Sequence, residues 1–220
     1  MGTELWHATG PTGNIYPAGI THTGLLEKVM PDWNKIYSEK DINAATPAEV
    51  LLQNTHLLPE KGRALDYASG LAGNGFYLAH KGFNVSAWDL SEIAVEKTNA
   101  KASHEDIKLQ AEVKDLENTT ALEKNHEQFD LIVVSYFLHR QSLRKLYDYL
   151  KKGGLLFYQT YSGQQRNGTG PARAAFRLHR GELLSVYSDM QLLYYREDTY
   201  HKNNAPPTSK PDQVYFVAMK

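Results

Sequence analysis

Between residues 63 and 161, short apolar runs rich in β-branched residues alternate with amphipathic segments. The clearest apolar run spans residues 129–136 and is continuous, as expected of a parallel strand that is buried on both faces. Strands that alternate with helices at this spacing predict a parallel, doubly wound α/β sheet. The strands are expected at 63–67, 84–88, 107–111, 129–136 and 155–161, followed by 191–195 and 214–219.

Capping residues predict where the helices begin and end. Thr46 and Glu49 form a capping-box pattern with Pro47 at the first helical position, which predicts a helix over 46–57. Ser91 is the expected N-cap of a helix that runs to about residue 103. Further helices are expected after the glycine turn up to residue 80, over 140–151 with Gly153-Gly154 as its end signal, and over 181–187.

The composition excludes several classes of protein. The chain has 220 residues and is 41% hydrophobic, enough for one domain with a full core. It has no cysteine, which excludes disulfides, a cysteine nucleophile and thiolate metal sites, and we expect no metal site. The longest apolar run is far shorter than the roughly 20 residues of a membrane span. We therefore expect no membrane partner and a cytoplasmic location.

Residues 1–29 differ from the rest of the chain. They contain five Gly, five Thr and two Pro and show no periodicity, so we expect a poorly structured N-terminal extension before a domain over 30–220. Met30 begins a segment that resembles a natural chain start, and translation could begin there. Mass spectrometry of the native protein would test this hypothesis, and finding only the full-length terminus would contradict it.

Charge is distributed unevenly along the chain, although the net charge is −1. Residues 89–130 hold 11 acidic and 5 basic residues, whereas residues 140–180 hold 9 basic residues and one acidic residue. The basic stretch is either a solvated surface or a positive field that attracts an anionic substrate. Nucleic acid is the weaker alternative because the overall charge is near neutral. The sequence carries no signal for an oligomeric state.

In a doubly wound sheet, ligands bind at the carboxyl ends of the strands, so the residues that follow each strand are the candidates. A turn of small residues over 66–75, which includes Asn74, lets a ligand approach the backbone at a helix N-terminus. Asp89 ends the second strand, where its carboxylate can accept hydrogen bonds from ribose hydroxyls or cap the next helix. Asp115 can accept from an exocyclic amine beside the apolar Leu116. Residues 135–140 place hydroxyl, imidazole and guanidinium groups after the fourth strand.

Together these motifs resemble those of class I S-adenosylmethionine-dependent methyltransferases, over about residues 30–220. The quoted pieces are Leu65–Gly70, Asp89, Asp115-Leu116, Phe129–Val134 and Leu150–Gly154. Within that superfamily, Trp33–Tyr37, Leu138–Arg140 and Gly181–Leu184 look most like the small bacterial branch of tellurite-resistance and thiopurine-type enzymes. The resemblance implies a Rossmann-like methyltransferase fold. This is a doubly wound, mostly parallel seven-stranded sheet with helices on both faces and an antiparallel last strand.

The resemblance also implies roles for individual residues. Asp66 would orient the methionine end of S-adenosylmethionine, and the backbone of Ala68, Ser69 and Gly70 would contact it. Asp89 would hold the ribose, Leu90 and Leu116 would sandwich the adenine, and Asp115 would accept from its amine. Ser135 would line the sulfonium side, and Trp33 and Tyr37 would close over the cofactor. The last pair could equally be plain helix packing.

The implied activity is methyl transfer to a small acceptor by in-line displacement, a reaction in which the protein mainly supplies orientation and a dry pocket. If a base is needed, His139 is the best-placed candidate and Tyr136 a weaker one, although His139 could be a structural residue at a helix start. Arg140, with Arg166 or Arg173, could hold an anionic acceptor.

Two alternatives remain open. The family commonly has Gly where this chain has Ala68 and Ala72, and alanine is expected to serve there if φ stays negative. A noncatalytic binding protein with a degenerate cofactor site is therefore one alternative. A nicotinamide-dependent oxidoreductase is the other, because Tyr147 and Lys151 match a Tyr-x-x-x-Lys pattern. That match lies too close to Gly70 in the chain to leave room for the strand–helix units that such an enzyme places between them. Its spacing fits an ordinary packed helix.

Overall fold

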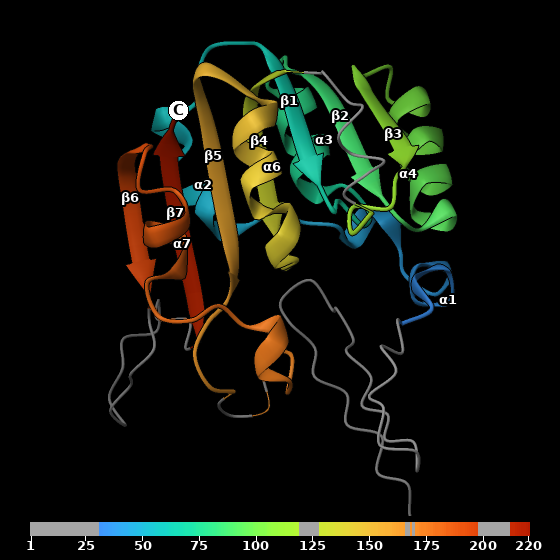
Figure 1. Cartoon of the computed structure of the whole chain (residues 1–220). Coiled ribbons are helices and arrows are strands. Elements are labelled where there is room, and N and C mark those ends of the chain that lie inside the picture. The colour runs from blue at the N-terminus through green and yellow to red at the C-terminus, as the bar shows by residue number, and fades with distance from the viewer. Residues whose placement is uncertain (1–30, 119–127, 166–167, 169, 198–211) are drawn as a thin grey trace, which may run out of the picture.

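The structure is a computed structural model that describes residues 31–118, 128–165, 168, 170–197 and 212–220. The N-terminal extension expected over 1–29 lies outside the described residues, as does Met30. The described part is a twisted sheet with helices on both of its faces (Figure 1).

The sheet has seven strands in the order β3-β2-β1-β4-β5-β7-β6. Strands β1 to β5 pair in parallel, and β7 runs antiparallel to both of its neighbours, β5 and β6. The predicted fold class is therefore confirmed. The strands are β1 (Arg63–Tyr67), β2 (Asn84–Asp89), β3 (Leu109–Val113), β4 (Phe129–Ser135), β5 (Leu150–Tyr161), β6 (Gln191–Glu197) and β7 (Gln213–Met219).

Strand order reverses between β1 and β4, which makes their carboxyl ends the expected ligand-binding edge.

The helices are α1 (Trp33–Ser38), α2 (Glu49–Gln53), α3 (Gly73–His80), α4 (Glu92–His104), α6 (Leu143–Tyr149) and α7 (Glu182–Val186). Single-turn 3₁₀ segments lie at Ile42–Ala44, Thr55–Leu57, Arg140–Ser142 and Ala174–Phe176.

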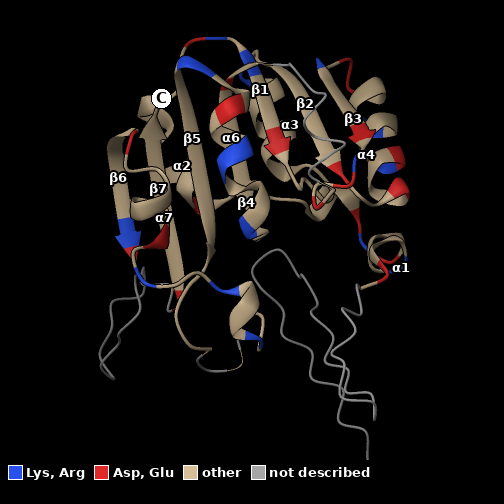
Figure 2. Cartoon of the chain, in the orientation of Figure 1, with Lys and Arg blue, Asp and Glu red and all other residues tan. Residues whose placement is uncertain are grey.

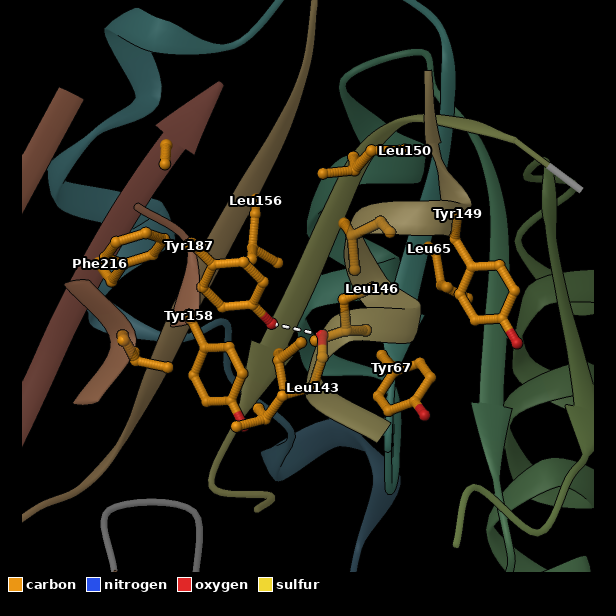
Figure 3. Packing of buried hydrophobic residues seen from close by; sticks show 14 of the residues in the cluster. Leu65, Tyr67, Leu143, Leu146, Tyr149, Leu150, Leu156, Tyr158, Tyr187 and Phe216 are labelled. Atoms are coloured by element: carbon orange, nitrogen blue, oxygen red, sulfur yellow. Dashed lines mark hydrogen bonds between the residues drawn. The ribbon is translucent and has the colours of Figure 1, made fainter. Parts of the chain in front are cut away.

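Strand β4 explains why its sequence is continuously apolar. Leu131 and Val133 pack in the core under α2 and α3, whereas Ile132 and Val134 pack in the core under α6 and α7. All four side chains are fully buried, so neither face of the strand tolerates a polar residue. Figure 3 shows the α6 and α7 side of this core, where the Tyr187 hydroxyl donates to the Leu143 carbonyl at 2.7 Å.

The helix expected over 46–57 is wrong in its bounds and its cap. The α-helix spans only Glu49–Gln53, and no side chain caps its start. Instead, the Ala48 amide donates to Oδ1 of Asn74, 26 residues away in the chain and 2.8 Å away in space. The local capping-box signal therefore lost to a tertiary hydrogen bond. In contrast, the predicted cap at Ser91 is confirmed, because its hydroxyl accepts from the Ala94 amide at 3.2 Å.

The prediction that Gly153-Gly154 ends the helix over 140–151 is also wrong. Helix α6 ends at Tyr149, and both glycines lie inside β5. The Gly153 amide donates to the Lys220 carbonyl at 2.7 Å, and Gly153 takes a left-handed φ of +78°. The C-terminal end of the chain therefore draws this segment into the sheet. Strand β3 begins two residues later than expected, at Leu109, where it pairs with Val85 of β2.

Candidate functional site

A pocket of about 340 Å³ lies at the carboxyl ends of β1 and β4. One wall is the turn over residues 68–71 with the start of α3, and the opposite wall is the segment over residues 40–46. Tyr37 of α1, together with Ser135 and Tyr136 after β4, completes the lining. The pocket therefore lies where the reversal of strand order predicts a ligand site.

The turn between β1 and α3 has an unusual backbone. Ala68, Gly70 and Ala72 all have left-handed φ values, of +57°, +53° and +53°. The condition under which alanine was expected to serve here, a negative φ, is therefore not met. A left-handed conformation costs an L-residue about 1–2 kcal/mol, and it persists only where the surrounding structure imposes it. Here the packing of the turn, which contacts the pocket, imposes the left-handed conformation.

Gly70 is required for a second reason, which is its contact with Tyr37. A Cβ atom on Gly70 would lie 2.6 Å from the Tyr37 hydroxyl oxygen. Tyr37 is buried and its ring stacks on that of Trp33, with the centroids 6.0 Å apart. The two predicted aromatic residues therefore stack on each other, and Tyr37 lies over the glycine turn and reaches the pocket. Gly73 is needed similarly, because a side chain there would collide with the Thr46 backbone.

Asp66 lies behind the pocket and reaches it through Asn74. Its Oδ1 accepts from Nδ2 of Asn74 at 3.0 Å, and its Oδ2 accepts from the Gly75 amide at 2.9 Å. Nδ2 of Asn74 also donates to the Ser135 hydroxyl at 3.2 Å. Complete burial of Asp66 raises its pKa to about 7, despite these hydrogen bonds. Asn74 and Ser135, rather than Asp66, therefore present polar atoms to the pocket.

Asp89 joins the end of β2 to the glycine turn. Its Oδ2 accepts from the Gly70 amide at 2.7 Å, and its Oδ1 accepts from the Ser91 amide at 2.9 Å. Burial raises the pKa of Asp89, an effect that the backbone hydrogen bonds oppose. The Leu90 amide also donates to this carboxylate, so one of its roughly four lone-pair positions remains. The structure shows the contact with the start of α4 that the sequence suggested, and the role of Asp89 as a ribose acceptor stays a prediction.

The three residues expected around an adenine ring have different surroundings. Leu90 is 41% exposed and presents an open apolar surface. Leu116 is buried in the core that also contains Trp88. The exposed Asp115 accepts from the Glu117 and Asn118 amides, which is a local turn. None of the three lines the pocket, so their roles in cofactor binding stay predictions.

Tyr136 and His139 differ as candidate bases. The Tyr136 hydroxyl donates to Gln213 and accepts from Gln159, and burial raises its pKa above the ordinary value. Tyr136 is therefore a poor base near neutral pH. His139 does not line the pocket. The Ser142 hydroxyl donates to the His139 carbonyl, so Nδ1 of His139, 3.2 Å away, acts as the donor to that hydroxyl. In the neutral ring the lone pair is then on Nε2.

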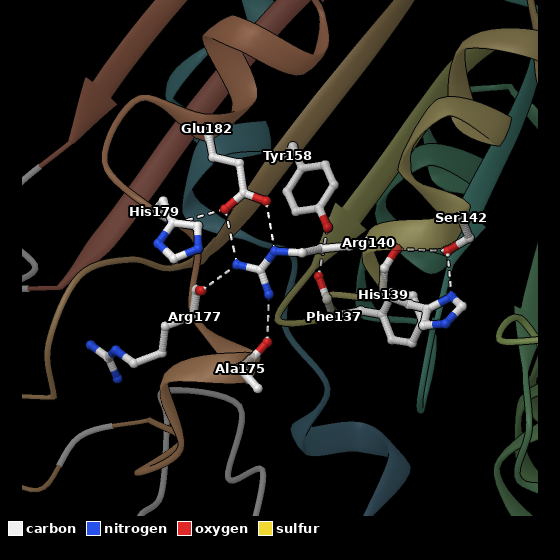
Figure 4. Close-up of polar contacts among 9 residues, drawn as sticks. All are labelled: Phe137, His139, Arg140, Ser142, Tyr158, Ala175, Arg177, His179 and Glu182. Carbon is white, nitrogen blue, oxygen red and sulfur yellow. Dashed lines mark hydrogen bonds and ion pairs between the residues drawn. The ribbon is translucent and has the colours of Figure 1, made fainter.

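Arg140 binds within the chain rather than facing the pocket (Figure 4). Its Nε and one terminal nitrogen form a two-pronged pair with Glu182, at 2.8 and 2.9 Å. The guanidinium also donates to the carbonyls of Ala175 and Arg177. This geometry favours a brace that holds residues 175–182 beside α6. Two arginines were expected to act with Arg140. Arg166 lies outside the described residues, and Arg173 lies two residues after Pro171, just before residues 175–182.

The charge pattern of the sequence is visible on the described surface (Figure 2). Lys and Arg lie on α6 and on the segment around residues 173–180, whereas α4 carries both Glu and Lys and the end of β3 carries Glu. Over the residues described, no group of three His, Asp or Glu side chains is placed to hold a metal ion. No helix among these residues is long and apolar enough to cross a membrane.

The pocket brings together seven of the fifteen residues that the sequence singled out. They are Tyr37, Ala68, Ser69, Gly70, Asn74, Ser135 and Tyr136. The sequence did not predict the opposite wall over residues 40–46 as part of the site. This segment has no motif, and its Thr46 was assigned to a helix cap. No local signal could have found it, because long-range contacts alone bring it to the turn.

The sequence of the chain matches the model of a known protein family. The model of the tellurite resistance protein TehB matches residues 32–215, most of the chain. The chain belongs to the TehB family. This confirms the resemblance drawn from the motifs, that of a class I S-adenosylmethionine-dependent methyltransferase of the tellurite-resistance branch.

The individual proteins that this chain is similar to share little sequence identity with it. Hemagglutinin 1 of Eikenella corrodens is 26% identical over 163 residues, which are 71% of this chain and 53% of that protein. The chain thus spans about half the length of that relative. The crystal structure of TehB from Haemophilus influenzae superposes with a TM-score of 0.64 at 20% identity, covering 86% of this chain and 67% of the other. A TehB-like S-adenosylmethionine-dependent methyltransferase from Corynebacterium glutamicum gives a TM-score of 0.56 at 18% identity, covering 85% and 92%. These likenesses support the fold.

Proposed function

We propose that this protein transfers a methyl group from S-adenosylmethionine to a small acceptor that enters beside Ser135 and Tyr136. The observation that carries the proposal is the pocket between the glycine turn and the segment over residues 40–46, with Tyr37 above Gly70. This cofactor supplies a methyl group that is already activated by the sulfonium charge. The protein's task is then to orient the reactants and exclude water.

The residues present fit a cationic ligand of this size. The turn brings bare backbone to the pocket, since no side chain fits at Gly70. Two carboxylates lie directly behind it, Asp66 through Asn74 and Asp89 through the Gly70 amide. Negative charge behind a backbone cradle favours a ligand that carries sulfonium and ammonium groups. Asp89 keeps one lone-pair position that a ribose hydroxyl could use.

The acceptor side is the wall made by Ser135 and Tyr136. The Tyr136 ring packs on that of the buried Tyr161, with the centroids 5.4 Å apart, which holds Tyr136 in this wall. The Ser135 hydroxyl offers a polar contact beside it. The hypothesis of an anionic acceptor depended on Arg140, whose charge is paired with Glu182. The proposal is therefore a small acceptor without a required charge. His139 does not line the pocket, so the proposal assigns no residue as the base.

Calorimetric titration with S-adenosylmethionine and S-adenosylhomocysteine tests the cofactor site, with NADH as the ligand control. We expect micromolar binding that Asp89→Ala abolishes, because the alanine removes an acceptor from the Gly70 amide. Asp189→Ala is the matched control, since Asp189 is an exposed carboxylate paired with Arg144 away from the pocket. Failure of folded, ligand-free wild type to bind would contradict the proposal.

Turnover is measured next, as S-adenosylhomocysteine released with a thiol, an oxyanion, a small carboxylate and a nucleoside as acceptors. Ser135→Ala should lower kcat/KM for the active acceptor, whereas Asp189→Ala should not. A noncatalytic binding protein is the second candidate, and the left-handed Ala68 and Ala72 favour it because they strain the cofactor turn. Folded wild type that binds neither S-adenosylmethionine nor S-adenosylhomocysteine would favour that candidate.

A further inference from the structure

Helix α1 is too short to hold its own position. It has six residues, and isolated helices of this length are not stable in water. Yet it carries Tyr37, whose hydroxyl lies against Gly70 at the pocket. The position of the Tyr37 side chain must therefore come from what holds α1 on the rest of the protein.

Both ends of α1 are fixed to α4. At the N-terminal end, Oδ1 of Asn34 accepts from the Ser91 hydroxyl at 2.7 Å and from the Ile93 amide at 3.3 Å. At the C-terminal end, Nζ of Lys97 donates to the carbonyls of Tyr37, Ser38 and Lys40, at 2.7, 3.0 and 2.9 Å. Lys97 is 57–60 residues away from these carbonyls in the chain.

The chemistry of these three contacts is specific to an ammonium group. A lysine side chain has three N–H donors, and here each has one carbonyl acceptor. The carbonyls at the C-terminal end of a helix carry partial negative charge, so a cation is favoured there. The guanidinium of arginine is larger and planar, so it cannot occupy the place of this compact ammonium group between the three carbonyls.

From this geometry we propose that Lys97 is a positioning residue of the cofactor site, which anchors the C-terminal end of α1 and thereby holds Tyr37 over Gly70. Lys97 does not line the pocket and acts through Tyr37. This inference rests on the proposed function, because it assigns to the closed position of Tyr37 the role of retaining S-adenosylmethionine or its product.

The first test is the dissociation rate of S-adenosylhomocysteine from the full-length protein, measured by stopped flow. Lys97→Met should raise the dissociation rate about tenfold because methionine has no donor, and Lys97→Arg should also raise it because the larger planar guanidinium does not fit the place of the ammonium group. Lys101→Met is the matched control on the same helix. Nζ of Lys101 contacts the Asn43 side chain and Glu105 but none of the α1 carbonyls, so we expect a rate within twofold of wild type.

A double-variant cycle separates positioning from general stability. If Lys97 acts through Tyr37, Lys97→Met should change the dissociation rate less than twofold in a Tyr37→Ala background. A tenfold effect of Lys97→Met in both backgrounds would overturn the proposal, as would a wild-type rate in both Lys97 variants.

Hydrogen exchange over residues 33–40 gives a readout that needs no ligand. Lys97→Met should speed exchange in this segment, and Lys101→Met should leave it unchanged. Unchanged exchange in Lys97→Met would overturn the anchoring role. Failure of wild type to bind would instead contradict the proposed function, so the two failures are distinguishable.

Discussion

The Gly70 amide donates a hydrogen bond to Oδ2 of Asp89 at 2.7 Å. This contact links the glycine turn after β1 to the carboxylate that ends β2, 19 residues later in the chain. Asp89 also accepts from the Ser91 amide, so the same carboxylate fixes the start of α4. Asp89 therefore links the glycine turn to α4, the helix that anchors α1. A ligand that binds to the turn contacts groups whose positions are already fixed.

Gly70→Ala should damage the site in two ways. The new methyl group would collide with the Tyr37 hydroxyl, and the left-handed φ of +53° would cost roughly 1–2 kcal/mol. We expect a lower free energy of unfolding in urea and at least tenfold weaker binding of S-adenosylhomocysteine. Adding Tyr37→Phe, which removes the hydroxyl, should recover part of the binding but not the backbone cost. Full recovery of stability in the double variant would contradict this account.

Ala68→Gly should stabilise the protein. Glycine adopts φ of +57° without the steric cost that alanine meets, although it loses more entropy on folding. We expect a net gain of about 1 kcal/mol in the free energy of unfolding. The control is Ala94→Gly in α4, where glycine should lower stability by a similar amount. Equal destabilisation by both variants would show that the turn at Ala68 is unstrained.

The raised pKa of Asp66 predicts how stability depends on pH. The ordinary value is 3.8 and the folded value is about 7, so the folded state binds more protons than the unfolded state between these values. Stability should therefore fall as pH rises from about 4 to about 7 and then level off, by up to about 4 kcal/mol. Urea unfolding at pH 5 and pH 8 measures this change. Asp66→Asn removes the titration and should show a smaller change between the two pH values. An identical pH dependence in the variant would exclude Asp66 as the source.

The Arg140 brace should contribute more to stability than a surface ion pair. Arg140 makes four hydrogen bonds to Glu182 and to the carbonyls of Ala175 and Arg177. We expect Arg140→Ala to cost about 2 kcal/mol in thermal or urea unfolding. Arg144→Ala is the control, because its pair with Asp189 is exposed to solvent and should contribute clearly less. Equal losses in the two variants would mean that the brace is no stronger than a surface pair.

Glu182 adds a pH test of the same brace. Partial burial raises its pKa, but hydrogen bonds from Arg140 and the His179 amide outweigh this and hold the pKa below the ordinary value of 4.5. The stabilisation from this carboxylate is therefore present above its unfolded pKa and lost as pH falls through the lower folded value. Glu182→Gln should flatten the acid side of the stability profile. A profile that matches wild type below pH 5 would contradict the assignment.

The sequence alone was enough to predict the parallel sheet, most strand positions and the Ser91 cap. These features depend on local patterns, because apolar runs and caps act over a few residues. Ser135 and Asn74 were predictable as neighbours of a ligand site for a related reason, since each follows a strand whose carboxyl end lies at the reversal of strand order.

Tertiary structure decided the rest. It gave the segment over residues 40–46 its place in the pocket, imposed left-handed φ on Ala68 and Ala72, and drew Gly153-Gly154 into β5. It also paired Arg140 with Glu182, 42 residues away, and Lys97 with carbonyls 57–60 residues away. These outcomes depend on hydrogen bonds between groups far apart in the chain. Such groups must find partners once they are removed from water, and only the folded arrangement determines which partners are within reach.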